Sequence, residues 1–427
     1  MYSFIKLVTL ISFFSIINLA CFSSYESSDD GQLIYWTAPN VEVSEFDRTM
    51  VHMWNTTHPQ NKIKWEIIPA GTTSEEVLLT AIATGRGPDI STNIFAGFAA
   101  QLAEADAIVA LDTLPGFWQL LEKRKMTSIV KKNWMFKGHV YVLPIYISPQ
   151  LMWYNKRILN ELEVNRLPKT YGEFIKLSKK ARKHNYYGLW VDVSAVWWKR
   201  WFDFITLYSA ASGGQSYLDL QNKKTFLESE AGRAVTKFFY DIFTLGLSPR
   251  FEIKDGFEKG QFLASIMDAA RIVRAKKLYP DLEYVISPLI VPDSYPQDAP
   301  VYTFAEQKGM VIFSYSKKRK RAWEFMKWFF SDEHDLLWME ITHYLPARDD
   351  LLTNPSFKLY FEKNSTMKLF AESIRYAAPL VLSPQTVQIQ TLLNRELWQP
   401  IVFGAKTPIQ AVRDANKSIS QLLHSGT

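Results

Sequence analysis

Three tryptophans lie within five positions of the segment VWWKRWFDF, residues 196–204. A flat aromatic ring can stack on a weakly apolar face of a small molecule, so this cluster has the side chains of a binding platform. If the segment begins a helix, Trp197 and Trp201 share one face and Trp198 points away from them. Aromatic stripes at helical spacing are also typical of a buried core. Platform and core therefore both remain open for Trp197 and Trp198.

Residue patterns that mark common enzymes do not occur in the sequence. The seven histidines are never spaced as His-Glu-x-x-His, and a single cysteine excludes a metal site built from several cysteines. No Gly-x-Ser-x-Gly motif of a serine hydrolase is found. We therefore expect no metal, no cofactor and no catalysis. The paired carboxylates of a glycosidase have no fixed spacing, so a secreted carbohydrate-active enzyme remains the alternative.

Length and composition indicate a globular protein with more than one core. A chain of 427 residues predicts two or three domains. Hydrophobic residues make up 47% and charged residues 22%, which is enough apolar surface to fold. Aromatic residues reach 15%, an unusually high share that agrees with an aromatic binding surface.

The first residues have the features of an export signal. Residues 1–20 carry one Lys and no acid ahead of an apolar run at 7–17, which is shorter than the roughly 20 residues of a membrane span. Cys21 follows directly and resembles the acylated residue of a bacterial lipoprotein, although Asn18-Leu19-Ala20 departs from the usual pattern with Leu three places before the cysteine. A chance cysteine after an ordinary secretory signal is the alternative. We expect an exported, periplasmic or cell-surface protein without disulfides, tethered through Cys21 by the polar segment 22–32.

Side-chain caps predict where several helices begin. Capping pairs occur at Ser44 with Asp47, Thr73 with Glu76, Thr170 with Glu173 and Thr407 with Gln410. Each pair precedes apolar residues at helical spacing, such as Phe46, Met50 and Trp54 after the first. The sequence therefore predicts amphipathic helices after these four positions.

Short β-rich segments alternate with these helices. They are LIYWT at 33, KIKWEII at 62, YVLPIYI at 141, YVISPLIV at 284 and GMVIF at 309. Alternation of this kind predicts α/β layers with mostly parallel sheets. Ligands of such sheets bind outside the carboxyl ends of the strands, which draws attention to Trp36 and Asn40 at the end of the first strand. Trp36 could equally fill the core.

The segment LLTAIATGRGPDI, residues 78–90, predicts a sharp corner from a helix to a strand. Gly85 stands where a helix needs a left-handed stop, and a strand follows from Ile90. A phosphate-binding glycine loop would need the opposite order, strand then helix, so we exclude it. Asp89 is expected to bond its own backbone in the turn.

Taken with its neighbours, TAIATGRGPDI resembles a signature of family 1 extracellular solute-binding proteins, the receptors of ABC importers for sugars and related solutes. Further segments are similar to this family in the same order along the chain. They are FDRTMVHMWNTTHPQNKIKWE, YVLPIYISPQLMWYNKRIL, LPKTYGEFIKLSKKA, FEKGQFLASIMDAAR, the stretch from RAWEFMKWFF to LPARDD, and FGAKTPIQAVRDANKSI. The matches extend from about residue 33 to residue 423.

The resemblance implies a two-lobed periplasmic-binding-protein-like fold of type II, with a mainly parallel sheet flanked by helices in each lobe. Residues 33–147 and 305–343 would form the N-terminal lobe, and residues 148–304 and 344–427 the C-terminal lobe. The chain would cross near 146–150, 302–306 and 344–348. A solute, expected to be a sugar, would bind in the cleft and be trapped by hinge closure. ABC permease subunits would be the protein partners of a monomeric receptor. A binding protein that feeds a sensor kinase is a further alternative.

Nine side chains are candidates for contact with the solute, drawn from the end of the first strand, the aromatic cluster and the segments that carry the resemblance. The candidates are Trp36, Asn40, Tyr146, Trp197, Trp198, Asp268, Arg271, Glu306 and Arg348. The family often has glycines near Ala305-Glu306 and a Gly-Trp pair in place of Asp268 and its neighbours, so the usual sugar contacts are altered here. Arg271 beside acids would suit a polar or anionic substituent, or an internal ion pair. Tyr146 and Arg348 could instead only support the crossings.

A basic run, KKRKR at 317–321, precedes apolar residues at helical spacing. It is most simply a solvated helix start. An exported protein seldom meets nucleic acid, so we expect no nucleic-acid partner. Anionic lipid or the transporter are the remaining partners for this run.

Overall fold

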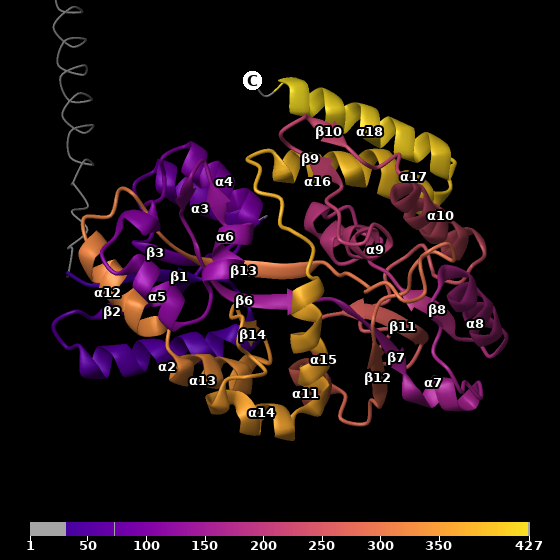
Figure 1. Cartoon of the computed structure of the whole chain (residues 1–427), viewed down its shortest axis with the longest axis horizontal. Helices are drawn as coiled ribbons and strands as arrows, with labels where there is room; N and C mark the ends of the chain where they lie inside the picture. The colour runs from indigo at the N-terminus through magenta and orange to yellow at the C-terminus, as the bar shows by residue number, and fades with distance from the viewer. Residues whose placement is uncertain (1–30, 72, 426–427) are drawn as a thin grey trace, which may run out of the picture. The chain divides into compact units, whose positions relative to one another are not determined.

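The computed structural model describes residues 31–71 and 73–425. The chain from Leu33 onward forms one compact unit (Figure 1). The predicted signal segment, Cys21 and most of the tether lie outside the described residues. Within residues 31–71 and 73–425, no helix is both long and apolar enough to cross a membrane.

The first of two large sheets has six strands in the order β14-β6-β13-β3-β1-β2. The strands are β1 (Leu33–Thr37), β2 (Ile63–Ile67), β3 (Ile90–Ile94), β6 (Leu143–Pro149), β13 (Ala305–Ile312) and β14 (Leu345–Pro346). β1 pairs in parallel with β2 and with β3. β13 runs antiparallel to β3 and β6, and β14 runs antiparallel to β6. The first three strands thus pair as predicted.

The second sheet has the strand order β12-β7-β11-β8. Its strands are β7 (Leu151–Asn155), β8 (Tyr187–Trp190), β11 (Phe262–Met267) and β12 (Tyr284–Ser287). Only β11 and β8 are parallel, while β7 is antiparallel to both of its neighbours. The prediction of mainly parallel sheets was therefore wrong in detail. β7 continues directly from β6, so the crossing fixes its direction, which is opposite to that of its neighbours β11 and β12.

Helices lie on both faces of the first sheet (Figure 1). They are α2 (Val41–Thr57), α3 (Ser74–Ala83), α4 (Ala96–Glu104), α5 (Phe117–Lys123), α6 (Thr127–Asn133), α12 (Arg319–Phe329) and α13 (Asp332–Thr342). The predicted capping pair of α3 is confirmed, because Thr73 Oγ1 accepts a hydrogen bond from the Glu76 amide at 3.2 Å. Gly85 follows α3 with a φ of +67°, the predicted left-handed stop.

Helix α2 corrects a sequence prediction. It begins at Val41, before the predicted start at Ser44. Asn40 Oδ1 accepts a hydrogen bond from the Val43 amide at 3.3 Å, so Asn40 supplies the cap. The predicted apolar stripe of Phe46, Met50 and Trp54 is nevertheless buried.

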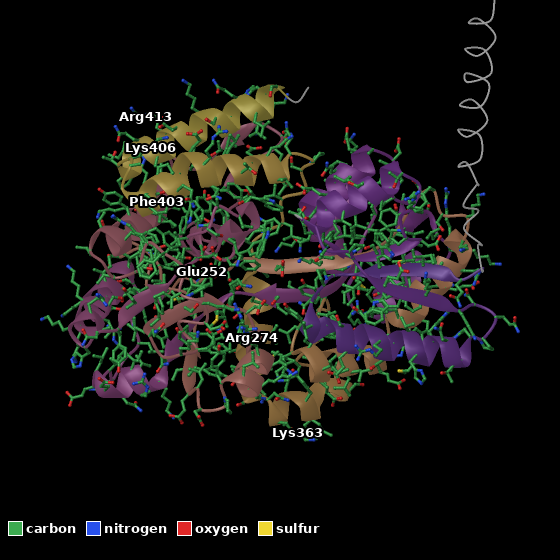
Figure 2. The ribbon with its side chains drawn as sticks, turned by 180° about the vertical axis from the view of Figure 1, so that it is seen from behind. Glu252, Arg274, Lys363, Phe403, Lys406 and Arg413 are labelled. Carbon is green, nitrogen blue, oxygen red and sulfur yellow. The ribbon has the colours of Figure 1, made fainter. Side chains whose placement is uncertain are left out.

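The remaining helices surround the second sheet. They are α7 (Lys156–Glu161), α8 (Tyr171–Lys183), α9 (Phe204–Ala211), α10 (Glu230–Thr244), α11 (Arg271–Leu278), α14 (Lys358–Lys363), α15 (Ser365–Ser373), α16 (Thr386–Leu393), α17 (Gln399–Phe403) and α18 (Pro408–Ser425). Thr170 caps α8 as predicted. Thr407 and Gln410 form the predicted reciprocal cap of α18. Figure 2 shows this helix next to the labelled Lys406.

The corner at residues 85–89 fixes the start of β3 to two other segments. Asp89 Oδ2 accepts a hydrogen bond from the Ile34 amide at 2.8 Å, and Oδ1 accepts one from Ser316 Oγ at 2.6 Å. Asp89 was predicted to bond its own turn. The structure instead uses it to join β1 to the segment that leads into α12, because the corner places the carboxylate between them.

Candidate functional site

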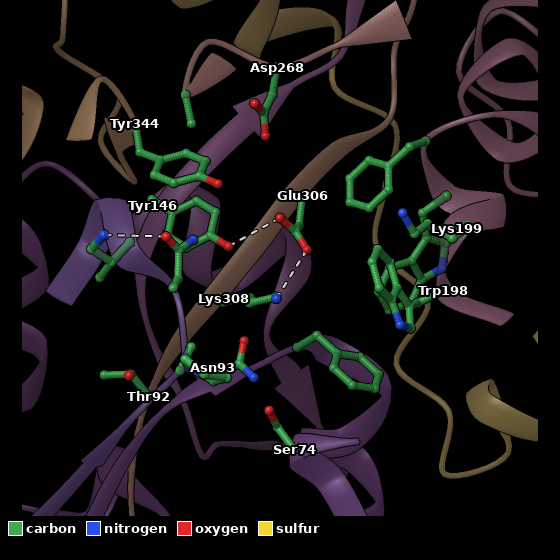
Figure 3. Close-up of a pocket in the computed structure, with 18 of the residues that line it drawn as sticks. Ser74, Thr92, Asn93, Tyr146, Trp198, Lys199, Asp268, Glu306, Lys308 and Tyr344 are labelled. Carbon is green, nitrogen blue, oxygen red and sulfur yellow. Dashed lines mark hydrogen bonds and ion pairs between the residues drawn. The ribbon is translucent and has the colours of Figure 1, made fainter. Parts of the chain in front are cut away.

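A cavity of about 940 Å³ is lined by residues of both sheets (Figure 3). On the side of the first sheet, its wall is made by the carboxyl ends of β1, β2 and β3 and the segments that follow them, including Asn93 in β3 and Asn40 after β1. Parallel strands bring their carboxyl ends to one edge, which explains how these distant segments meet. Asn93, at the end of β3, has a φ of 65°, a left-handed conformation that asparagine tolerates better than most residues.

The second wall is aromatic. Trp197–Trp201 form the single 3₁₀ turn η2 before α9, where an α-helix was expected to begin. Trp197 and Trp201 pack edge to face with ring centroids 5.3 Å apart, as the predicted shared face implied. Trp198 also lines the cavity, and Lys199 Nζ lies 4.6 Å from its ring centroid. Trp197 and Trp198 are both half-buried, whereas Trp201 belongs to the core.

A polar group lies where β6 and β13 pair. Tyr146 donates from its hydroxyl to Glu306 Oε2 at 3.1 Å, and Lys308 Nζ lies 3.3 Å from Glu306 Oε1. The Tyr146 ring stacks on Tyr344 at 4.6 Å. Burial and the charge of Glu306 raise the pKa of Tyr146 well above its ordinary value, so the phenol remains a donor. Glu306 is thereby held in one orientation toward the cavity (Figure 3).

Asp268 faces the cavity beyond Glu306, at the end of β11. Burial, followed by the charge of Glu306, raises the pKa of Asp268 to about 6, while Arg271 lowers it. Arg271 itself lies 3.8 Å from Glu258, and Glu306 is paired with Lys308. Arg271 and Glu306 therefore pair with residues other than Asp268, and Asp268 is a half-buried residue of the cavity wall.

Four acids of the cavity lining were missed by sequence reasoning, namely Asp47, Glu75, Asp192 and Asp203, and two of them have strongly raised pKa values. Asp47 was interpreted as a capping residue, but it is buried in α2 and bonded by the Tyr35 hydroxyl at 3.3 Å. Burial raises the pKa of Asp47 to about 7. Asp203 lies 3.5 Å from Arg200, and burial raises its pKa to about 7 despite that guanidinium. An acid in the middle of an apolar stripe, as at Asp47, was the signal available in the sequence.

Seven of the nine predicted contact residues line the cavity. They are Asn40, Tyr146, Trp197, Trp198, Asp268, Arg271 and Glu306. The other two lie elsewhere in the fold. Trp36 is buried in β1 and donates from Nε1 to Glu66 at 2.7 Å. Arg348 is buried and pairs with Asp332, Asp335 and Asp350, which agrees with the supporting role considered for it. Contact of the seven lining residues with a ligand remains a prediction.

Other cavity residues had no signal in the sequence. Thr92, Lys308 and Trp338 reach the cavity only through the sheet order and the crossings, whereas Tyr344 stands at the start of the third predicted crossing. Among residues 31–71 and 73–425, no group of three His, Cys, Asp or Glu side chains is arranged to hold a metal ion.

Two α/β sheets connected by crossing strands, with a large cavity lined by both, define a periplasmic-binding-protein-like receptor. The chain belongs to the family of bacterial extracellular solute-binding proteins, whose family model matches residues 40–335. It is 22% identical over 365 residues to the maltotriose-binding protein of Pyrococcus abyssi, covering 83% of this chain and 74% of that protein.

Solved structures share the fold along nearly the whole chain. An uncharacterized protein of Listeria monocytogenes, lmo0859, is 30% identical with a TM-score of 0.78, covering 92% of this chain and 99% of that one. The cyclic alpha-maltosyl-1,6-maltose binding protein of Arthrobacter globiformis is 18% identical with a TM-score of 0.76, at the same coverage. The family and the fold expected from the sequence are confirmed.

Proposed function

We propose that this solute-binding protein is the extracytoplasmic receptor of an ABC importer and that it captures a carbohydrate-like solute. One observation carries the proposal: the cavity places the exposed faces of Trp197 and Trp198 in the same space as oriented acids and amides. A sugar has both weakly apolar C–H faces and a rim of hydroxyls, so it needs flat rings and hydrogen-bond acceptors together. The names of the maltotriose and maltosyl-maltose binders support the same class of ligand.

Individual roles follow from the contacts of each side chain. Trp198, and Trp197 beside it, stack on a sugar face. Glu306, which Tyr146 and Lys308 orient, accepts hydrogen bonds from hydroxyl groups of the solute. Asp268 accepts hydrogen bonds from other hydroxyl groups of the same solute. Arg271 contacts a polar or anionic substituent at the end of the cavity formed by α11. Asn40 lies at the rim, where its amide caps α2 and its position permits a further hydrogen bond.

Binding is proposed to close the cavity by a hinge motion. Residues from both sheets line it, so a ligand that touches both sides stabilises the closed arrangement through its additional contacts there. The proposed lobe boundaries, at 147/148, 304/305 and 343/344, lie at or near the ends of β6, β13 and β14. These few crossing segments would absorb the change in backbone angles.

Delivery to the importer requires partners outside this chain. We propose that the receptor is exported, that Cys21 carries a lipid anchor, and that a monomer hands its solute to permease subunits. Mass spectrometry of the membrane-extracted protein tests the anchor, since an acylated Cys21 would be the first residue of the mature chain. An unmodified residue 21 in soluble, exported protein would contradict it.

A ligand screen tests the central proposal. A solute bound by the native state alone raises the melting temperature, and a concentration of 100 times Kd stabilises the native state by about 2.7 kcal/mol. We expect one carbohydrate or polyol to do so among sugars, polyols, glycerol phosphodiesters and amines. Chromatography of the recovered ligand must show it unchanged. Conversion of the ligand to product, abolished by Asp268→Asn and Glu306→Gln, would instead identify a carbohydrate-active enzyme.

A further inference from the structure

One strongly basic surface has no role in the cavity. We define the basic edge as Lys62, Arg86 and the run 317–321, which come from three separate segments of the chain. It lies at the amino ends of β1, β2 and β3, because these strands begin at Leu33, Ile63 and Ile90. The cavity lies at the opposite, carboxyl ends of the same strands. A strand of five residues separates the two by about 15 Å.

Specific contacts bring the three segments together. The Tyr315 hydroxyl donates to the Pro88 carbonyl at 2.6 Å, which places Arg86 beside the basic run. Arg321 donates from Nε to the side chain of Asn61, the neighbour of Lys62. The basic edge is therefore a fixed part of the first sheet and its corner.

The positive charge of this edge is weakly compensated. Within the described part of the chain, Lys62, Arg86, Lys317 and Lys320 are exposed and have no acid at ion-pair distance. Asp89 lies 3.9 Å from Lys318, but it is buried and already accepts from Ile34 and Ser316. The guanidinium of Arg319 donates to the backbone carbonyls of Ser314 and Ser316.

Some cations elsewhere in the described chain are paired with acids, unlike the exposed cations of the basic edge. Lys406, labelled in Figure 2 beside α18, lies 3.2 Å from Glu396 and 2.8 Å from Asp414. An ion-paired lysine of this kind contributes little net field, whereas adjacent unpaired cations add their fields.

We propose that the basic edge binds the anionic surface of a membrane. The place where the chain joins the compact unit supports a lipid surface over other acidic partners. Leu33, the first residue of β1, donates from its amide to the Lys62 carbonyl at 3.0 Å, so the preceding segment joins the compact unit at this edge. If Cys21 carries a lipid, only the eleven residues 22–32 separate the anchor from this edge.

The consequence is an orientation. With the basic edge on the bilayer, the cavity lies at the opposite, carboxyl ends of the strands and is separated from the lipid by the first sheet. The proposal uses the proposed anchor at Cys21 but does not depend on the identity of the solute. A vesicle assay without solute therefore tests it separately from the proposed function.

The experiment compares the full chain with charge variants by sedimentation with vesicles. Neutral vesicles contain phosphatidylcholine alone, and anionic vesicles contain added phosphatidylglycerol. The test variant is Lys317→Gln/Arg319→Gln/Lys320→Gln. The matched control is Lys176→Gln/Lys179→Gln/Lys183→Gln, which removes the same charge from exposed lysines of α8. Circular dichroism melts verify that both variants remain folded.

We expect the wild-type chain to prefer anionic vesicles at low salt. One Lys or Arg beside an anionic surface strengthens binding roughly fivefold, so the test variant should lose roughly 100-fold of its anionic partition. The control should lose much less, and neutral vesicles should not distinguish the three proteins. High salt, which shortens the screening length to about 3 Å, should remove the preference.

Three outcomes would overturn the proposal. Equal losses in the test and control variants would show that net charge alone acts. A second outcome is that the wild-type chain shows no preference and only the variant Glu26→Gln/Asp29→Asn/Asp30→Asn prefers anionic vesicles. In that case the acidic segment before Leu33, and not lipid, occupies the basic edge. Unchanged lipid partition of the test variant with loss of solute uptake would assign the edge to the permease.

Discussion

The acids of the cavity differ in how their charge is held, and this difference determines what each can do. Glu306 is fixed between a phenol and an ammonium group, which hold its carboxyl group in one orientation. Asp268 has a pKa raised to about 6 by burial and by Glu306, so it changes charge close to neutrality. The aromatic wall has no such dependence on pH. Substitution of a cavity tryptophan therefore tests the contribution of stacking to solute affinity, and substitution of a cavity acid tests the contribution of hydrogen bonding.

Replacement of Trp198 tests the stacking surface. Trp198→Ala should weaken solute binding roughly tenfold, about 1.4 kcal/mol, because the ring offers a half-buried face to the cavity. Titration calorimetry measures the change. The matched control is Trp118→Ala, since Trp118 is also half-buried beside a lysine, with Lys131 Nζ 5.4 Å from its ring, but lies outside the cavity lining. Equal loss of affinity in both variants would contradict a specific role for Trp198.

The pKa of Asp268 predicts that binding depends on pH. If the solute donates to the ionised carboxylate, affinity should fall about tenfold between about pH 7.5 and pH 5, because about a tenth of a carboxyl with a pKa of about 6 is ionised at pH 5. Asp268→Asn should bind more weakly at pH 7.5 and lose this dependence. The same fall in affinity in Asp268→Asn would show that another group titrates.

At the scale of elements, the helix-to-strand corner acts as a structural connection. Asp89 joins β1, β3 and the segment before α12 through two hydrogen bonds, of which the one from Ser316 is buried and the one from Ile34 is partly buried. The buried cluster of Arg348 with Asp335, which also pairs with Arg124 at 2.5 Å, connects α13 to β14 in a similar way. Both connections involve charged groups in the interior, where the loss of one partner is costly.

Asp89→Ala should lower the free energy of unfolding by about 2–4 kcal/mol, because the Ile34 amide and the Ser316 hydroxyl both lose an acceptor. Ser316→Ala removes only one of these bonds and should cost about 1 kcal/mol. Denaturant unfolding monitored by tryptophan fluorescence measures both. Equal losses in the two variants would show that the bond to β1 contributes nothing.

At the scale of the whole molecule, the cavity is bounded by two sheets that few segments connect. We expect the radius of gyration measured by small-angle X-ray scattering to fall when the identified solute is added, because closure brings the two walls together. Trp198→Ala at saturating solute should still close, since the remaining contacts reach both walls. A radius that does not change on ligand binding would contradict the hinge.

Three of the four helix caps predicted from the sequence are confirmed by the structure. The caps at Thr73, Thr170 and Thr407 involve residues three positions apart, so the chain itself specifies these helix starts. The order of motifs along the chain was sufficient for the family and the fold. Asn40 was missed as a cap because Ser44 and Asp47 offered the same local pattern one turn later.

Only the tertiary structure decided which side chains share the cavity. Tyr146 and Glu306 are 160 positions apart, and their hydrogen bond depends on the antiparallel pairing of β6 with β13, which no local pattern encodes. The same pairing brought in Lys308, whereas Arg348 is held outside the cavity lining by Asp332, Asp335 and Asp350. Caps and turns are specified by neighbours in the sequence, whereas a binding cavity is specified by contacts between distant segments that exist only after the sheets have formed.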